Sequence, residues 1–281
     1  MELRGSIMSK IYAALERHEK EKSLKAKRLP IGEPESLIKK GPRSPLGREL
    51  IIQNGFSPKL AVLSAPESFD AENFKILRSQ ILFPKDGERP RTIMVTSAFP
   101  GEGKTFLSAN LAVSLALGID EYVLLVDCDF RNPNVHKMLG YSNLEGLHEY
   151  LTGRRELPDL IIRTRIEKLS LLTAGKSLYS PAELLSSTMM KEFLEEVKGR
   201  YQDRFIIIDA TPSQVTAEAN VLANYVDGII FVVMAQKAPR ETIQRSIENL
   251  GKKKILGIVF NGYDQSYKSY RKYYKKYYKE K

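Results

Sequence analysis

The chain of 281 residues contains a single cysteine and no tryptophan. One cysteine excludes a disulfide framework and any zinc site built on cysteine pairs, and it fits a reducing cytoplasm. Long apolar segments are missing too: the longest run, 228–235, is too short to span a bilayer, and no secretory signal opens the chain. We therefore expect a cytoplasmic protein with no membrane-spanning segment of its own.

Negative charge is scarce at both ends of the chain. Residues 1–60 carry 13 Lys and Arg against 7 Asp and Glu, and residues 263–281 carry 7 against 2. The part between them, 61–262, is nearly neutral, with 24 against 25. This distribution predicts a globular body with two basic extensions, which favour an anionic partner such as an acidic protein, a lipid surface or nucleic acid. Solvated polar tails without a partner are the alternative.

Composition and breakers divide the chain into three parts: a basic arm over 1–60, a domain over 61–262 and a tail over 263–281. At 42% hydrophobic residues the chain can bury a sizeable core, which excludes wholesale disorder. Residues 11–28 have the composition of a helix, and prolines and glycines over 30–47 break any long element after it. Met8 is an alternative start to Met1.

Apolar runs alternate with helical patterns from residue 64 onward. We expect strands at 92–97, 122–127, 169–173, 205–209, 228–234 and 255–261. We expect helices at 67–81, 105–117, 146–151, 182–201, 217–225 and 241–250. Because the strands are continuous Val, Ile and Leu runs, they are buried on both faces. The pattern predicts an α/β fold with a mostly parallel sheet and helices on both faces.

A glycine-rich loop over 97–105 lies between an expected strand and an expected helix, which is the setting that a P-loop requires. Gly101 and Gly103 let the backbone curl so that its N–H groups point inward at phosphates, together with the positive helix end. Lys104 adds a cation for the phosphates, and the Thr105 hydroxyl can bind Mg²⁺. The loop predicts the P-loop of a nucleotide-binding protein, with Mg²⁺ beside the phosphates.

This loop is a variant, because Ala98 stands where the standard pattern has glycine. The loop indicates a nucleotide without indicating a reaction. The predicted ATP contacts are Phe99, Pro100, Gly101, Glu102, Gly103, Lys104, Thr105 and Phe106.

Three aspartates stand where expected strands end. Asp127 and Asp129 follow the run 123–126, and Asp209 follows 205–208. The carboxyl ends of strands meet at the crevice where open α/β sheets bind ligands, and acids beside a triphosphate hold Mg²⁺ or accept a hydroxyl proton. Any single aspartate could instead cap the next helix. Cys128 points to the other side of its strand, and we expect it to pack in the core.

With these pieces together, the chain from residue 64 to its end resembles the bacterial tyrosine kinases (BY-kinases) that regulate exopolysaccharide and capsule assembly. The loop 98–105 is similar to the family's P-loop, residues 124–131 to its Walker A′ strand and residues 205–209 to its Walker B strand. The segment 180–185 resembles a Pro-x-Glu-Leu-Leu motif common in these kinases. A tyrosine-rich tail follows the last strand, as in the family.

The resemblance implies a role for each site residue. Lys104 and Thr105 bind phosphate and Mg²⁺, and Lys104 counts among the catalytic residues. Asp127 is the first candidate for the base that takes the tyrosine proton. Asp129 lies near the metal and Asp209 orders it through water, so the implied metal site is Thr105, Asp129 and Asp209. The choice of base among the three aspartates stays open.

The family's Glu-x-x-Arg-x-x-Arg interface motif is present as Glu72, Lys75 and Arg78, with lysine in place of the first arginine. The resemblance implies that these residues join copies of the chain in a ring-like homo-oligomer. The lysine weakens any bidentate contact there, and solvated helix charges are the alternative. The family's Pro-Pro after the Walker B acid is also absent, since 210–212 is Ala-Thr-Pro.

Half of the 14 tyrosines lie in the last 19 residues. The expected phosphoacceptors are Tyr263, Tyr267, Tyr270, Tyr273, Tyr274, Tyr277 and Tyr278. The segment has no aliphatic residue to bury, which suits a kinase substrate, and its basic residues would steer it to a neighbour's acidic site. Alternatively, a helix would collect rings on one face, or the tail would stack on nucleic acid or lie on anionic lipid. We expect no nucleic acid.

The resemblance also implies partners: a membrane-anchored polysaccharide co-polymerase as activator, which would hold the protein at the inner face of the membrane, and a cognate tyrosine phosphatase. Residues 8–16 resemble the arm of kinases beside exosortase-linked systems. The alternative function is a ParA/MinD-like partitioning or positioning ATPase. Those proteins carry a lysine at the position of Phe99, and its absence here and the tyrosine tail argue against them.

Overall fold

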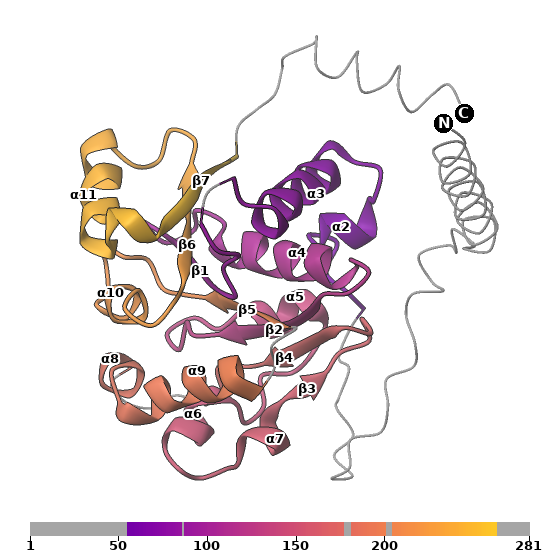
Figure 1. Ribbon diagram of the computed structural model, residues 1–281, viewed down its shortest axis with the longest axis vertical. Helices are drawn as coiled ribbons and strands as arrows, with labels where there is room; N and C mark the ends of the chain where they lie inside the picture. The colour runs from indigo at the N-terminus through magenta and orange to yellow at the C-terminus, as the bar shows by residue number, and fades with distance from the viewer. Residues whose placement is uncertain (1–54, 86, 177–180, 201–203, 263–281) are drawn as a thin grey trace, which may run out of the picture. The chain divides into compact units, whose positions relative to one another are not determined.

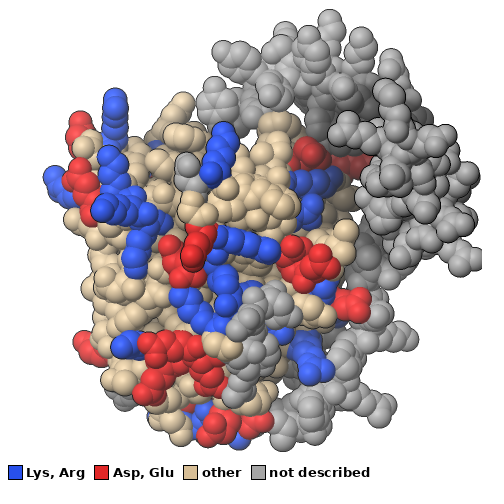
Figure 2. All heavy atoms as spheres, viewed as in Figure 1, with Lys and Arg blue, Asp and Glu red and all other residues tan. Residues whose placement is uncertain are grey.

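The computed structural model describes residues 55–85, 87–176, 181–200 and 204–262 (Figure 1). Most of the predicted arm and all of the predicted tail lie outside these ranges. Within them, every helix is too short or too polar to cross a bilayer. Figure 2 shows lysine and arginine side chains interspersed with acidic ones over the described body, in keeping with its near-neutral composition.

One sheet organises the described chain, with the strand order β3-β4-β2-β5-β1-β6-β7. Its strands are β1 (Thr92–Ser97), β2 (Tyr122–Asp127), β3 (Ile162–Arg163), β4 (Leu169–Leu172), β5 (Arg204–Asp209), β6 (Gly228–Met234) and β7 (Ile255–Asn261). All neighbouring strands run parallel except β3 and β4. The six predicted strands are confirmed to within one residue. The sequence missed β3, because two residues show no periodicity.

Helices cover both faces of this sheet, as predicted (Figure 1). One face is covered by α2 (Ala61–Ser64), α3 (Phe69–Leu82), α4 (Lys104–Ala116) and α5 (Val135–Leu139). The other is covered by α6 (Leu147–Leu151), α7 (Leu157–Leu160), α8 (Pro181–Leu185), α9 (Thr188–Arg200), α10 (Glu218–Leu222) and α11 (Arg240–Leu250). A short 3-10 helix, η2 (Lys252–Lys254), precedes β7. Alternate strand residues enter the two cores, as the two-residue period of a strand requires.

The single helix predicted over 182–201 is two helices, α8 and α9. The break lies at Ser187, whose hydroxyl donates to the Leu184 carbonyl (2.6 Å) and accepts from the Met190 N–H (3.2 Å). A serine side chain that accepts an N–H three residues ahead starts a new helix. The composition of the segment favours helix throughout, and this local hydrogen bond decides the break.

Helix α3 begins as its sequence suggests and packs on α4. Ser68 caps it by accepting from the Ala71 N–H (3.1 Å). The predicted apolar stripe faces the core, with Phe74 and Ile81 buried and Leu77 packed against them. The Phe74 ring meets the Phe106 ring edge-on, with 5.7 Å between their centroids. Since Phe106 lies in the first turn of α4, α3 reaches the start of the helix that follows the glycine-rich loop.

Candidate nucleotide and phosphoryl-transfer site

The glycine-rich loop connects β1 to α4 at the carboxyl edge of the sheet. Gly101 and Gly103 have φ values of +72° and +98°, and Gly103 is the N-cap of α4. A Cβ on Gly103 would collide with the Asn261 side chain, so both conformation and space require glycine there. Ala98 is buried and has no positive φ, which explains why alanine serves at the variant position.

The first turn of α4 joins this loop to the end of β5. Lys104 is buried at 7% exposure. The Thr105 hydroxyl donates to Asp209 Oδ2 (2.7 Å), and the Ser108 hydroxyl donates to Asp209 Oδ1 (2.9 Å). The sequence analysis missed Ser108, although a residue three positions after Thr105 lies on the same side of a helix.

Two of the three aspartates are strand neighbours. Asp127 at the end of β2 and Asp209 at the end of β5 are register partners, and both are buried. Lys104, Asp127 and Asp209 therefore lie at the same edge of the sheet, as predicted. An arrangement with either acid at the opposite edge would have excluded a shared site.

Burial dominates the electrostatics of this pair. Desolvation raises the pKa of Asp127 well above its usual 3.8, and the charge of Asp209 raises it further. Burial also raises the pKa of Asp209 to about 6, although hydrogen bonds from Thr105 and Ser108 and the charge of Lys104 lower it in part. Two adjacent buried carboxylates do not both ionise cheaply, so the pair favours a shared proton or a bound cation.

Asp127 also organises the backbone that follows it. Its Oδ1 accepts from the Asp129 N–H, and its Oδ2 accepts from the N–H groups of Asn134 and Val135, each at 3.1 Å. These last two donors lie at the start of α5, so the helix-capping alternative describes part of what Asp127 does. Cys128 is buried in the core with a free thiol, as expected.

A pocket of about 630 Å³ opens over the glycine-rich loop. Lys104, Thr105 and Asp129 line it, whereas Asp127 and Asp209 lie buried beneath. The sequence analysis missed several residues that line it and are brought in only by the fold: Ser57, Lys59, Arg131, Asn132, Asn134, Lys137, Met138, Thr211, Pro212, Val215 and Thr216. Lysine and arginine side chains on these segments surround the pocket with positive charge, which suits an anionic ligand.

Of the predicted ATP contacts, Pro100, Gly101, Gly103, Lys104, Thr105 and Phe106 line this pocket. Phe99 and Glu102 do not. The Phe99 N–H donates to Glu102 Oε2 (2.7 Å), and the Glu102 side chain is fully buried. The backbone donor of Phe99 is therefore engaged within the loop.

Arg131 is held at the pocket by a buried acid. Its Nη2 lies 2.9 Å from Oε1 of Glu218, whose side chain is fully buried on α10 while that of Arg131 is 57% exposed. Burial by itself would raise the pKa of Glu218, but hydrogen bonding, which includes the Arg131 contact, and the charge of Arg131 lower it overall. The ion pair leaves the outer side of the guanidinium open to the pocket.

The metal prediction names a hydroxyl and two carboxylates. Within the described ranges, no group of three or more His, Cys, Asp or Glu side chains is arranged to hold a metal ion. Mg²⁺ in nucleotide sites takes one or two protein oxygens and completes its shell with phosphates and water. Here the Thr105 hydroxyl is hydrogen-bonded to Asp209, and Asp129 lines the pocket wall. These few oxygens suit a Mg²⁺ site completed by phosphates and water, and they do not form a site made of protein ligands alone.

The predicted interface residues are partly engaged within the subunit. Lys75 Nζ lies 3.0 Å from Glu72 Oε2 one turn away on α3. Arg78 Nη1 donates to the Ser114 carbonyl (2.8 Å) in the last turn of α4. The predicted phosphoacceptor tyrosines lie outside the described residues.

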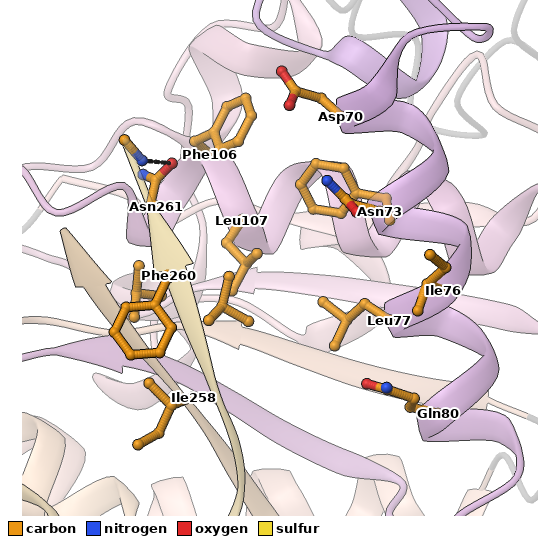
Figure 3. A pocket seen from close by; sticks show the side chains of 14 residues that line it. Asp70, Asn73, Ile76, Leu77, Gln80, Phe106, Leu107, Ile258, Phe260 and Asn261 are labelled. Atoms are coloured by element: carbon orange, nitrogen blue, oxygen red, sulfur yellow. Dashed lines mark hydrogen bonds between the residues drawn. The ribbon is translucent and has the colours of Figure 1, made fainter. Parts of the chain in front are cut away.

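A second pocket of about 470 Å³ lies between α3 and β7 (Figure 3). Its walls include Ile76 and Phe260, whose exposures are 51% and 71%. Phe106 lines both pockets, so the apolar hollow adjoins the glycine-rich loop.

Comparison with known proteins agrees with this geometry. Residues 90–254 match the family model described as AAA domain. The chain is 35% identical to the tyrosine-protein kinase YwqD of Bacillus subtilis over 202 residues, which covers 71% of this chain and 84% of that protein.

Solved structures point the same way. The kinase domain of the Escherichia coli tyrosine kinase ETK superposes with a TM-score of 0.68 at 29% identity, covering 74% of this chain and 81% of that one. The septum site-determining protein MinD from Pyrococcus horikoshii, complexed with Mg-ADP, gives 0.51 at 27% identity and covers 60% and 68%. The partitioning-ATPase alternative therefore shares the fold but is less supported. The chain belongs to the family of bacterial tyrosine-protein kinases.

Proposed function

We propose that the protein is an ATP-dependent tyrosine autokinase that phosphorylates the C-terminal tyrosines of a neighbouring copy. The observation that carries the proposal is the junction of the glycine-rich loop with two buried acids: Thr105 donates to Asp209, and Asp127 is the register partner of Asp209. Phosphoryl transfer depends on positioning and on charge stabilisation, and this edge of the sheet supplies both.

Separate residues bind the phosphates and the metal ion in this proposal. The N–H groups of the loop and Lys104 hold the phosphates, and Thr105, Asp129 and Asp209 hold Mg²⁺. When bound, Mg²⁺ neutralises charge on the transferring phosphoryl group. A cation held by these residues would also offset the mutual repulsion of the neighbouring carboxylates.

Asp127 is the proposed base for the tyrosine hydroxyl. Its raised pKa makes it a better proton acceptor than an exposed aspartate. Its three backbone hydrogen bonds hold the segment that carries Asp129 and Arg131. Accepting the proton and holding this segment are compatible, since carboxylate oxygens have several acceptor sites.

The substrate is the tail, through Tyr263, Tyr267, Tyr270, Tyr273, Tyr274, Tyr277 and Tyr278. Its lysines and arginines steer it towards the acids around a neighbour's nucleotide. Each phosphate adds nearly two negative charges and reverses that attraction. The proposed cycle is therefore self-limiting: assembly, phosphorylation in trans, and release by repulsion.

Assembly and partners complete the proposal. Glu72, Lys75 and Arg78 on α3 would contact the next copy in a ring. A membrane-anchored polysaccharide co-polymerase would activate the kinase and hold it at the inner face of the membrane, and a cognate phosphatase would reset the tails. In this way the kinase would regulate exopolysaccharide synthesis and export.

An anti-phosphotyrosine blot of the purified chain with and without Mg-ATP tests the proposal. We expect an ATP-dependent signal that Lys104→Met abolishes and that deletion of 263–281 largely removes while nucleotide binding survives. Lys191→Met is the matched control, because its side chain is 60% exposed on α9. Hydrolysis of ATP without a blot signal would support the partitioning function, and strong labelling of the tail-less chain would refute the tail as substrate.

A further inference from the structure

A buried carboxylate lies inside the phosphate-binding loop. Glu102 stands between the two left-handed glycines, and its side chain is 0% exposed. Its Oε2 accepts from the Phe99 N–H (2.7 Å) across the loop, and its Oε1 accepts from the Met234 N–H (3.3 Å) at the end of β6. A buried acid is costly without such partners, and here it also places negative charge where an anion must bind. Its two hydrogen bonds from backbone N–H groups offset part of that cost.

The same loop is held from outside by the ends of β6 and β7. Lys237 Nζ donates to the Pro100 carbonyl (2.6 Å), and Asn261 Nδ2 donates to the Glu102 carbonyl (2.9 Å). Figure 3 shows Asn261 at the end of β7, near Phe106 in the first turn of α4. The Ala235 N–H donates to the Asn261 carbonyl (2.9 Å), which joins the two strand ends. We name Met234, Lys237 and Asn261 the clasp.

The turn between Met234 and Lys237 contains a strained residue, Gln236. Gln236 has a φ of +59°, and it is the one non-glycine residue with positive φ among those the structure describes. A side chain in the left-handed region costs free energy, and the surrounding structure has to hold it there. The turn brings the ammonium of the next residue, Lys237, back over the loop.

We infer that Glu102 is a positioning residue for the nucleotide, which ties the phosphate-binding loop to the clasp and keeps it in its binding shape before ATP arrives. The inference rests on the proposed function, since a triphosphate has to bind at this loop. A loop already in its bound shape loses less conformational freedom on binding, so affinity rises without any new contact to the ligand. Glu102 thus acts through the backbone of the loop without touching the phosphates.

Titration of the full-length chain with a fluorescent ATP analogue and Mg²⁺ tests this inference, together with KM and kcat for tail phosphorylation. Glu102→Ala removes the acceptor of two N–H groups, and we expect affinity for the analogue to fall about tenfold or more. KM for ATP should rise in parallel while kcat stays within about threefold. Glu102→Gln keeps one acceptor and should recover part of the loss, and it remains informative if the alanine variant fails to fold.

Glu149→Ala is the matched control. Glu149 is also a buried carboxylate that accepts two backbone N–H groups, from Gly146 (2.6 Å) and Lys176 (3.3 Å), away from the phosphate-binding loop. We expect this variant to melt at a lower temperature with its affinity for the analogue within about twofold of wild type.

The outcomes separate the inference from the function on which it rests. If wild type binds the analogue and Glu102→Ala binds it equally well, or loses no more affinity than Glu149→Ala, the positioning role is wrong and the proposed function survives. If wild type does not bind the analogue at all, both are overturned. A loss confined to Glu102→Ala and partly restored in Glu102→Gln supports the inference.

Discussion

Replacing Asp209 by asparagine should stabilise the nucleotide-free protein and abolish phosphoryl transfer. Asp209 lies buried beside Asp127, and its ionised form is expensive in that environment. Asparagine removes the charge and keeps the shape. Its carbonyl can accept from one of the two hydroxyls, and its NH₂ group can donate to the other, so the contacts with Thr105 and Ser108 remain possible.

The magnitude follows from the shift in pKa. The pKa of Asp209 rises from 3.8 to about 6 on folding. One unit corresponds to about 1.4 kcal/mol, so its ionisation in the folded state costs about 3 kcal/mol at neutral pH. Asparagine removes this cost, but the rearranged hydrogen bonds reduce the gain. We expect the variant to be more stable by about 1–3 kcal/mol. In a domain of this size about 1 kcal/mol moves Tm by about 2–4 °C, which gives a rise of several degrees.

The dependence on pH has a definite sign. Between 3.8 and about 6 the folded state holds a proton on Asp209 that the unfolded state has lost. The contribution of Asp209 to the free energy of unfolding of wild type therefore falls as pH rises through this window and levels off above it. The asparagine variant lacks this contribution, so its advantage should be full at pH 7 and fade towards pH 4. It should also lower the pKa of Asp127, whose neighbouring charge is gone.

Thermal and denaturant unfolding of both proteins at pH 4, 5, 6 and 7 measures the effect, without nucleotide and with Mg-ATP. Wild type should gain stability from Mg-ATP, and the variant should gain little. Asp159→Asn is the control, because Asp159 is exposed on α7 and should change nothing. A variant that is less stable than wild type at pH 7, or a difference that does not change with pH, would contradict an energetic cost of ionising Asp209 in the folded state.

Three further predictions concern the site and α3. Thr105→Ala should reduce phosphoryl transfer about tenfold to a hundredfold, with part of the loss recovered at high Mg²⁺, measured by initial rates across a Mg²⁺ series; rates independent of Mg²⁺ would contradict a metal role. Asp127→Asn should lower kcat at least about a hundredfold and leave affinity for an ATP analogue within about threefold, and retained kcat would rule it out as the base. Arg78→Ala should cost about 1–2 kcal/mol in unfolding experiments, because it loses the Ser114 carbonyl at the end of α4. If Arg78 also contacts a neighbouring copy, the same variant should lower the oligomer mass measured by light scattering. Lys75→Ala is the comparison for stability, because the Lys75 side chain is 42% exposed and its loss should hardly change the free energy of unfolding.

The strands and the glycine-rich loop were predictable from local pattern. Runs such as Phe205 to Ile208 are apolar at every position, which is typical of a strand buried on both faces. The loop combines glycines at fixed spacing with a lysine and a threonine between a strand and a helix. Both features depend on a few adjacent residues, so they can be recognised in the sequence without knowledge of distant contacts.

Other features depended on residues far away in the chain. Arg78, which the resemblance places at an interface between copies, also donates to the Ser114 carbonyl of its own subunit, 36 positions later. The side chain of Glu102, a residue of the predicted ATP-binding loop, is buried and accepts from the Met234 N–H, 132 positions later. A local sequence pattern does not predict such partners, because residues far apart in the sequence come together only when the chain folds.

The class of fold, the position of the glycine-rich loop and the three aspartates at the strand ends could be read from the amino-acid sequence alone. These follow from periodicity and from residue chemistry at short spacing. Which of those side chains are buried, which of them hold the backbone and which face the pocket became visible only in the folded chain. The reason is physical: the pKa of Asp209, the partners of Glu102 and the ion pair between Arg131 and Glu218 arise from packing between separate elements of the sheet.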